Sequence, residues 1–118
     1  MDQLNAEKPL ADVLFDYDSS TLRDDGRAAA SRNADYLKRW TSVRITVEGH
    51  ADTRGTSEYN LALGERRSTA VRDYLTSRGI GADRLRTVSY GEERPKHDNA
   101  REETRRLNRR AALVVRVQ

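Results

Sequence analysis

The chain has 118 residues, which is the size of one domain with its own hydrophobic core. Charged residues make up 35% and the formal net charge is only +3, a balance that does not indicate a nucleic-acid-binding protein. The absence of cysteine excludes disulfides, thiolate zinc sites and a cysteine nucleophile. Arginine dominates the basic residues, and its guanidinium binds carboxylates and phosphates through two parallel hydrogen bonds.

The first predicted elements are a tail, a strand and a helix. Residues 1–9 are polar, so a flexible N-terminal tail is expected before a single domain over residues 10–118. The apolar run Leu10–Phe15 predicts a first strand. A helix is predicted over Asp24–Trp40, because two aspartates can cap its start. Trp40, at the end of this helix, is expected to pack in the core. The apolar stripe of this helix comprises Ala30, Ala34 and Leu37.

The middle of the chain contains the clearest strand and the longest helix. Apolar and polar residues alternate over Ser42–Gly49, which predicts a strand with one buried face. A second helix is predicted over Ser57–Arg78, since Gly79 then stands where a helix end favours a left-handed residue. The predicted inner face of this helix comprises Leu63, Ala70, Val71, Tyr74 and Leu75.

Two further strands complete the pattern. Arg84–Gly91 predicts a third strand and Arg109–Val117 a fourth, with a short helix or ordered loop over residues 100–108. The predicted order is therefore βαβαβ(α)β. Helices between strands favour parallel neighbours joined by right-handed crossovers.

Polar residues crowd the junction between the second strand and the second helix, in the loop His50–Thr56. Free backbone N–H groups at a helix start attract anions, and this edge of a sheet commonly holds ligand sites. Arg67 is predicted beside the buried stripe of the helix, where an unpaired charge is costly. Asp52 and Arg67 thus form either a clamp for an amino-acid head group or an internal ion pair.

Other kinds of site fit this junction less well. Glu48, His50 and Asp52 alternate as zinc ligands could, but Glu48 is predicted on the outer face of the strand. Ser57 with His50 and Asp52 resembles a catalytic triad, but no nucleophile elbow or oxyanion hole accompanies it. The basic strip over residues 101–116 contains two glutamates and no aromatic residue to stack on bases, which favours a solvated face over nucleic-acid binding.

Four separated motifs resemble a known family, that of the OmpA-like peptidoglycan-binding domains. They are LFDYDSSTL, GHADTRGTSEYNLALGERRSTAVRDYL, RLRTVSYGEERP and NRRAALVV, and together they span about residues 10–117. Within the family they most resemble the peptidoglycan-associated lipoprotein (Pal) branch. The resemblance implies an α+β fold in which two main helices pack on a four-stranded mixed sheet of order 1-4-2-3, with the fourth strand antiparallel to its neighbours.

The resemblance also implies a non-enzymatic function without cofactor or metal: non-covalent binding of the diaminopimelate-containing stem peptide of peptidoglycan. Asp52 would receive the amine of diaminopimelate and Arg67 its carboxylate. Phe15 and Asp16 would offer backbone N–H groups to the ligand. The same groove would be lined by Thr56, Asn60 and Leu63, and the NRR motif contributes Asn108 and Arg109.

The biological context implied by the resemblance is a periplasmic domain that anchors the outer membrane to the cell wall, with the TolB propeller as a competing partner. Neither nucleic acid nor direct membrane contact is expected, since a lipid anchor would belong to a longer precursor. The alternatives are the same domain in an outer-membrane porin or a flagellar stator protein, or a structural protein-interaction domain with an internal Asp52–Arg67 ion pair. The segment KHDNAREETRRLN is unusually charged for the Pal branch.

Overall fold

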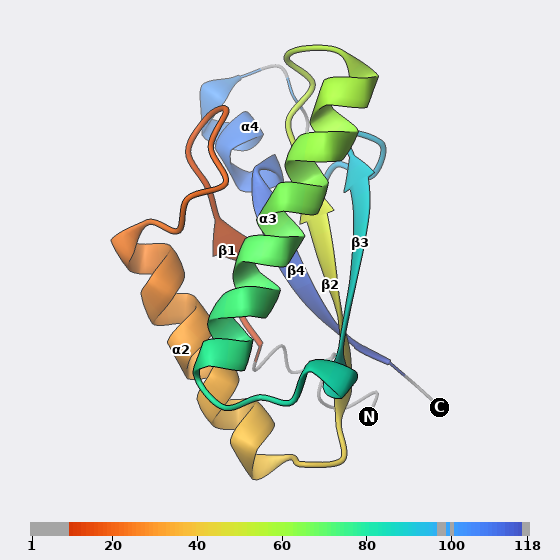
Figure 1. The fold of residues 1–118 in the computed structure, drawn as a ribbon. Helices are drawn as coiled ribbons and strands as arrows, with labels where there is room; N and C mark the ends of the chain where they lie inside the picture. The colour runs from red at the N-terminus through yellow and green to blue at the C-terminus, as the bar shows by residue number, and fades with distance from the viewer. Residues whose placement is uncertain (1–9, 97–98, 100, 117–118) are drawn as a thin grey trace.

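The computed structural model describes residues 10–96, 99 and 101–116, so the expected tail over residues 1–9 lies outside the described residues. Two helices, α2 and α3, lie on one face of a four-stranded sheet, and the shorter α4 lies at its end (Figure 1). The elements are β1 (Val13–Leu14), α2 (Asp24–Arg39), β2 (Arg44–His50), α3 (Ser57–Ser77), the 3-10 helix η1 (Ala82–Arg84), β3 (Leu85–Gly91), α4 (Glu102–Asn108) and β4 (Arg110–Arg116).

The sheet has the order β1-β4-β2-β3. β2 and β3 are parallel and joined through α3, whereas β4 runs antiparallel to both β1 and β2. The predicted α+β class and strand order are therefore confirmed. The residues around 102–108, expected as a helix or a loop, form the helix α4.

β1 is much shorter than the expected strand Leu10–Phe15, because a side chain replaces a neighbouring strand at its start. The Asn33 amide on α2 accepts a hydrogen bond from the Ala11 N–H at 2.8 Å and donates one to the Ala11 carbonyl at 2.9 Å. Both backbone groups of Ala11 are thereby satisfied without sheet pairing. At the other end, the Phe15 N–H still donates to the Arg109 carbonyl at 2.8 Å.

The core lies between the inner face of the sheet and the two long helices. The alternation predicted for the second strand holds, since Val43, Ile45 and Val47 are all buried. The stripe predicted on the first helix is buried as well, comprising Ala30, Ala34 and Leu37. Facing them from β4 are Ala111, Leu113 and Val115.

Trp40 corrects one expectation. It is 51% exposed rather than packed in the core. The helix ends at Arg39, and Trp40 contributes to this end through its backbone: its N–H donates to the Tyr36 carbonyl, and its carbonyl accepts from the Arg84 guanidinium. The single tryptophan thus marks a surface corner of the molecule.

α3 is capped at both ends, by Thr56 at its start and, as predicted, by Gly79 at its end. The Thr56 hydroxyl accepts a hydrogen bond from the Tyr59 N–H at 3.1 Å, as an N-cap does. At the other end Gly79 has a φ of 97°, and the Ile80 N–H donates back to the Leu75 carbonyl. The buried face comprises Asn60, Leu63, Gly64, Arg67, Ser68, Val71 and Leu75, so its first half is largely polar.

Glycine contacts bring the first half of α3 against the sheet. A Cβ on Gly49 of β2 would lie 1.6 Å from the Gly64 carbonyl oxygen, and one on Gly91 would lie 2.9 Å from the Leu61 nitrogen. No real side chain tolerates the first distance. The Ser89 hydroxyl also donates to the Leu61 carbonyl at 2.6 Å. The helix therefore touches the ends of β2 and β3 backbone to backbone, and its polar residues face the loop that follows β2.

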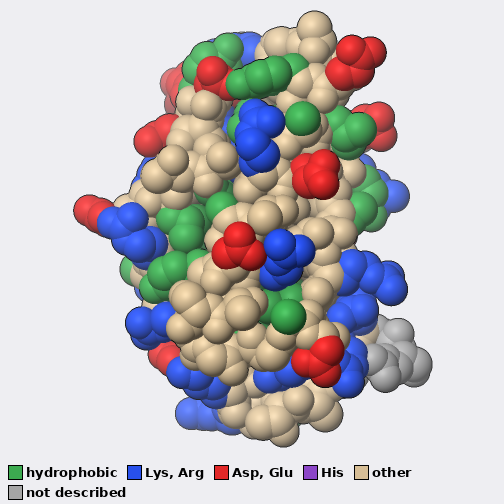
Figure 2. All heavy atoms as spheres, viewed as in Figure 1, with side chains coloured by type: hydrophobic (Ala, Val, Ile, Leu, Met, Phe, Trp, Pro, Cys, Tyr) green, Lys and Arg blue, Asp and Glu red, His purple; other side chains and the backbone are tan. Residues whose placement is uncertain are grey.

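The face seen in Figure 2 carries acidic and basic side chains interspersed, with apolar side chains in small groups between them. In the part of the chain that the structure describes, no helix combines the length and the apolar character that a bilayer crossing requires.

Candidate functional site

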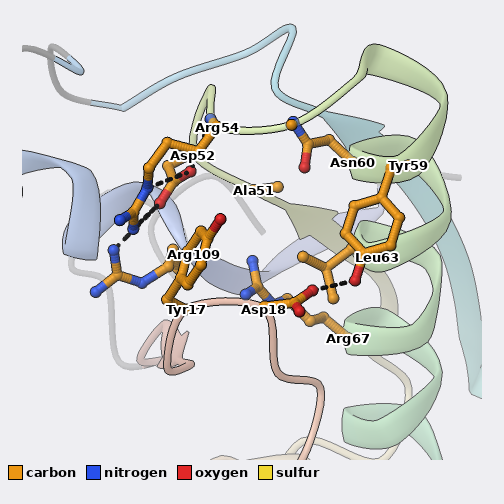
Figure 3. Close-up of a pocket in the computed structure, with 11 residues that line it drawn as sticks. Tyr17, Asp18, Ala51, Asp52, Arg54, Tyr59, Asn60, Leu63, Arg67 and Arg109 are labelled. Atoms are coloured by element: carbon orange, nitrogen blue, oxygen red, sulfur yellow. Dashed lines mark hydrogen bonds and ion pairs between the residues drawn. The ribbon is translucent and has the colours of Figure 1, made fainter.

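A pocket of about 130 Å³ opens where α3 begins, between this helix, the loop after β1 and the loop after β2 (Figure 3). It is lined by Tyr17, Asp18, Ala51, Asp52, Arg54, Gly55, Tyr59, Asn60, Leu63, Arg67 and Arg109. Asp52 and Arg67, which the sequence singled out, therefore share one cavity, together with Asn60 and Leu63.

Arg67 lies at the bottom of the pocket and is fully buried. Its guanidinium donates to three backbone carbonyls: Nε to Ser19 at 2.8 Å, Nη1 to His50 at 2.8 Å and Nη2 to Asp16 at 3.0 Å. The Phe15 ring lies 5.3 Å from the guanidinium carbon and covers it. Arg67 thus ties the loop after β1 to the end of β2.

The positive charge of Arg67 has no directly bound counter-ion among the described residues. No carboxylate of residues 10–96, 99 or 101–116 lies within ion-pair distance of it. Burial lowers the pKa of Arg67 to about 10, although the nearby charge of Asp52 opposes this shift, so the guanidinium is still protonated at neutral pH. Three of its five N–H donors are used, which leaves two for another acceptor.

Asp52 lies on another wall of the pocket and is 3% exposed. Its Oδ1 accepts from the Arg54 backbone N–H at 3.0 Å, and its Oδ2 accepts from Arg54 Nη2 at 2.8 Å and from Arg109 Nη1 at 3.2 Å. Burial alone would raise the pKa of Asp52, but the hydrogen bonds from Arg54 and Arg109 outweigh it and lower the pKa below its ordinary value. The carboxylate is therefore ionised well into the acidic range.

Asp52 and Arg67 do not form the internal ion pair that was one of the two alternatives. Asp52 is paired with Arg54 and Arg109, and Arg67 binds only backbone carbonyls among the described residues. The two opposite charges instead face one cavity from the loop and from the helix (Figure 3). This arrangement suits a small molecule that carries both an ammonium and a carboxylate.

Three other predicted site residues are not among the residues that line the pocket. Phe15 is buried beside Arg67, and its N–H is already bonded to the Arg109 carbonyl, so donation to a ligand stays a prediction that requires this bond to open. Asp16 contributes its carbonyl to Arg67 and its carboxylate to an ion pair with Arg23 at 3.1 Å. Thr56 caps α3, and a ligand contact for it also stays a prediction.

Asn108 and Arg109 of the NRR motif have separate roles. Arg109, 6% exposed at its side chain, bridges Asp52 to Glu102 of α4, where Nη2 lies 2.9 Å from Oε2. Asn108 does not line the pocket. Its side chain accepts from the Lys96 N–H at 2.8 Å and donates to the Asn99 side chain, which fixes the segment before α4.

Sequence reasoning missed three residues at the rim of the pocket, namely Tyr17, Asp18 and Arg54, which lie there beside Tyr59. One signal was available: aspartate commonly accepts a hydrogen bond from the N–H two residues later, so Asp52 and Arg54 are local partners. Nothing local indicates that Arg54 stacks on Tyr17, with 3.8 Å from the guanidinium carbon to the ring centroid, or that Tyr59 donates to Asp18.

His50 lies beneath the loop that follows β2. It is buried, its Nε2 lies 3.2 Å from Glu48 Oε1, and its carbonyl accepts from Arg67. Within the described residues no group of three or more potential ligand side chains is arranged to hold a metal ion. The backbone of His50 therefore supports the pocket floor, and its imidazole packs beneath the loop beside Glu48.

Comparisons with known proteins identify the family of the chain. Residues 14–109 match the OmpA family. A peptidoglycan-associated lipoprotein of Brucella melitensis is 50% identical over 103 residues, which are 87% of this chain and 61% of that protein. Outer membrane porin F of Pseudomonas aeruginosa is 45% identical over 105 residues, which are 88% of this chain and 30% of the porin.

The structural likeness is equally extensive. The crystal structure of the peptidoglycan-associated lipoprotein from Burkholderia pseudomallei superposes with a TM-score of 0.84 at 42% identity and covers 89% of each chain. The present chain spans about three-fifths of the length of the Brucella relative and less than a third of the porin.

Proposed function

Since the chain belongs to the OmpA family, we propose that its pocket binds the stem peptide of peptidoglycan without covalent chemistry and grips the zwitterionic end of diaminopimelate. The relatives named for peptidoglycan association support this class of ligand. Binding is reversible, so the domain serves as a tether that can release and rebind.

The observation that carries the proposal is the buried cation of Arg67. A desolvated charge is costly unless it is paired. Among the described residues its partners are neutral carbonyls, and two N–H groups remain for a further acceptor. A ligand carboxylate supplies both the missing negative charge and the missing acceptor atoms.

Asp52 supplies the complementary half of the clamp. Its lowered pKa keeps it negative, and a ligand ammonium is the cation that it would receive. The pocket volume of about 130 Å³ is a few times the roughly 30 Å³ that one water molecule occupies in the liquid. It therefore accommodates an amino-acid head group.

The remaining predicted residues take supporting positions in this proposal. Leu63 forms the apolar wall beside the aliphatic part of the ligand, and Asn60, held by Glu92 at 2.9 Å, presents its amide to the peptide. Asp16 offers its backbone N–H. Phe15 and Thr56 contribute through the loop and the helix cap that they stabilise.

Isothermal titration with three stem tripeptides tests the assignment. One ends in diaminopimelate, one in 2-aminopimelate, which lacks the distal ammonium, and one in lysine, which lacks the distal carboxylate. We expect Asp52→Asn to weaken the first peptide by about 30-fold, which is roughly 2 kcal/mol. The same variant should bind the aminopimelate peptide as the wild type does.

Arg67→Lys should weaken the peptides that carry the distal carboxylate and leave the lysine peptide unchanged. Discrimination between the diaminopimelate and the lysine peptide should therefore be lost. Circular dichroism establishes that each variant is folded before titration. No heat from the wild type with any of the peptides would refute the proposed function. Equal losses for all three peptides would leave binding intact as a function but refute the two assigned roles.

We place the domain in the periplasm, where it would anchor the outer membrane to the cell wall as in a Pal-type protein. The 50% identity to a peptidoglycan-associated lipoprotein over most of the chain supports this context. A TolB propeller is then the expected protein partner. A pull-down with TolB, repeated with excess diaminopimelate peptide, tests it: retention lost to the peptide indicates competition for one groove, and no retention at all argues against the partner.

The identity to porin F favours a second context, in which the same domain ends an outer-membrane barrel. The wall-binding chemistry is then the same, and only the membrane attachment differs. Fractionation of the full-length gene product, followed by mass spectrometry of its N-terminus, separates a lipid-modified protein from a barrel.

A further inference from the structure

We infer that Arg54 occupies the ammonium position of the pocket in the unliganded protein, and that ligand binding exchanges its guanidinium for the ligand ammonium. This inference rests on the proposed function and names the residue that controls access to Asp52. Arg54 would then set the selectivity of the site, because an incoming group must itself be a cation to take its place.

The first step is that the Asp52 carboxylate is fully occupied. Oδ1 accepts from the Arg54 backbone N–H at 3.0 Å and from Arg54 Nε at 3.4 Å. Oδ2 accepts from Arg54 Nη2 at 2.8 Å and from Arg109 Nη1 at 3.2 Å. A carboxylate offers about four lone-pair positions, and four donors already use them. An ammonium can bind only where a donor leaves.

The second step identifies the donor that leaves. Arg109 is enclosed, and its other donors bind the Phe15 carbonyl at 3.2 Å and Glu102 at 2.9 Å, so its position is fixed from three sides. The Arg54 side chain is 37% exposed and reaches Asp52 from the rim. Its contacts with the side chain of Asp52 are the ones that a long, solvent-accessible arginine loses at small cost.

The third step is the destination of the displaced guanidinium. Arg54 Nη2 already lies 3.5 Å from Glu102 Oε1, on α4, and the Glu102 side chain is half exposed. Arg54 also stacks on the Tyr17 ring at 3.8 Å, which gives its flat group a surface along which it can slide toward Glu102. Figure 3 shows Arg54 beside Asp52 and Arg109 at this rim.

The exchange conserves the charge around Asp52, since one cation replaces another. The apparent affinity for an ammonium ligand is reduced by the fraction of molecules in which Arg54 still covers the carboxylate. A ligand without an ammonium gains nothing from the removal of Arg54. Removal of Arg54 should therefore strengthen the binding of an ammonium ligand. Removal of an arginine that contacts the ligand would instead weaken binding.

Isothermal titration of Arg54→Gln tests the exchange with the diaminopimelate and aminopimelate tripeptides. We expect the diaminopimelate peptide to bind about three to ten times more tightly than to the wild type, as for the loss of a partly exposed competing ion pair. The aminopimelate peptide should bind unchanged. Arg72→Gln is the matched control, because Arg72 forms an ion pair with its neighbour Asp73 on α3, away from the pocket, and it should alter neither affinity.

A second measurement does not depend on the variant. The side-chain Nε–H signal of Arg54 in the wild type should shift when the diaminopimelate peptide is added, and not when the aminopimelate peptide is added. Weaker or equal binding of the diaminopimelate peptide by Arg54→Gln, or an unmoved Arg54 signal, would overturn the inference while the wild type still binds. A wild type that binds neither peptide would overturn the proposed function and this inference with it.

Discussion

Gly49 of β2 and Gly64 of α3 meet backbone to backbone: a Cβ on Gly49 would lie 1.6 Å from the Gly64 carbonyl oxygen. This contact sets the distance between the helix and the sheet at the point where the pocket opens. Any side chain at Gly49 must push α3 outward, and Arg67 moves with the helix.

Gly49→Ala should therefore destabilise the fold by about 3 kcal/mol, at the upper end of overpacking costs. Urea unfolding followed by circular dichroism measures the loss. Gly81→Ala is the control, because its Cβ would meet only the flexible Asp83 carboxylate, and its φ of −62° suits alanine. The control should be neutral or slightly stabilising. Equal effects at the two glycines would contradict the close approach.

Arg67→Lys should lower the free energy of unfolding by roughly 2–4 kcal/mol. A lysine keeps the charge but cannot reach all three carbonyls that the guanidinium binds. The neighbouring Arg66→Lys, on the exposed side of α3, should stay within about 0.5 kcal/mol of the wild type. A stable Arg67→Lys protein would show that the carbonyl contacts are dispensable for folding.

The pKa of Asp52 makes a further prediction about acid stability. Its pKa is lower in the folded protein than the ordinary 3.8, so its ionisation stabilises the folded state above about pH 3.8, and this contribution is lost as the pH falls through the folded pKa. Carbon-detected NMR of the carboxyl group should show a midpoint below 3.8. In Arg54→Gln the midpoint should rise, because the strongest favourable hydrogen bonds are gone. An unchanged midpoint would mean that Arg109 and the backbone N–H of residue 54 are enough to stabilise the carboxylate.

The pKa of Arg67, about 10, predicts a loss of carboxylate binding at high pH. An N-acetylated peptide that ends in 2-aminopimelate has no amine that titrates there. Its affinity should be constant from pH 7 to 9 and then fall, approaching about tenfold per pH unit well above pH 10, because only the protonated guanidinium attracts it. Fluorescence anisotropy measures the affinity, with circular dichroism to establish folding. Asp52→Asn should show the same decline, whereas a flat profile to pH 11 would separate Arg67 from the ligand.

Much of the architecture could be predicted from local pattern. The structure bears out the alternation around Ile45 and the stripe at Ala34, which depend on contacts that repeat every two to four residues. It also bears out the glycine after α3, which depends on the local backbone conformation. The short first strand could not be predicted, because the Asn33 side chain that replaces its pairing lies 22 residues from Ala11.

The candidate site, too, was predicted only in part from the sequence. Asp52, Arg67, Asn60 and Leu63 were predicted and line one pocket. The resemblance also implied Arg109, which lines the pocket, but not its contact with Asp52, since these residues lie 57 positions apart. The carbonyls on Arg67 come from backbone that carries no sequence signal. Sequence pattern indicates which charges are buried, whereas only the fold determines what they face.

The three carbonyls on Arg67 have a consequence for how such a site can change. The residue at the floor of the pocket also holds two loops together, so a substitution there alters stability and recognition at once. The side chain of Arg54 at the rim contacts only other side chains among the described residues, those of Asp52, Tyr17 and Glu102, and binds no backbone carbonyl there. Variation in ligand preference can therefore accumulate at the rim while the floor remains fixed. A directed-evolution library for new wall chemistries should randomise Arg54 and Tyr17 at the rim and leave the helix untouched.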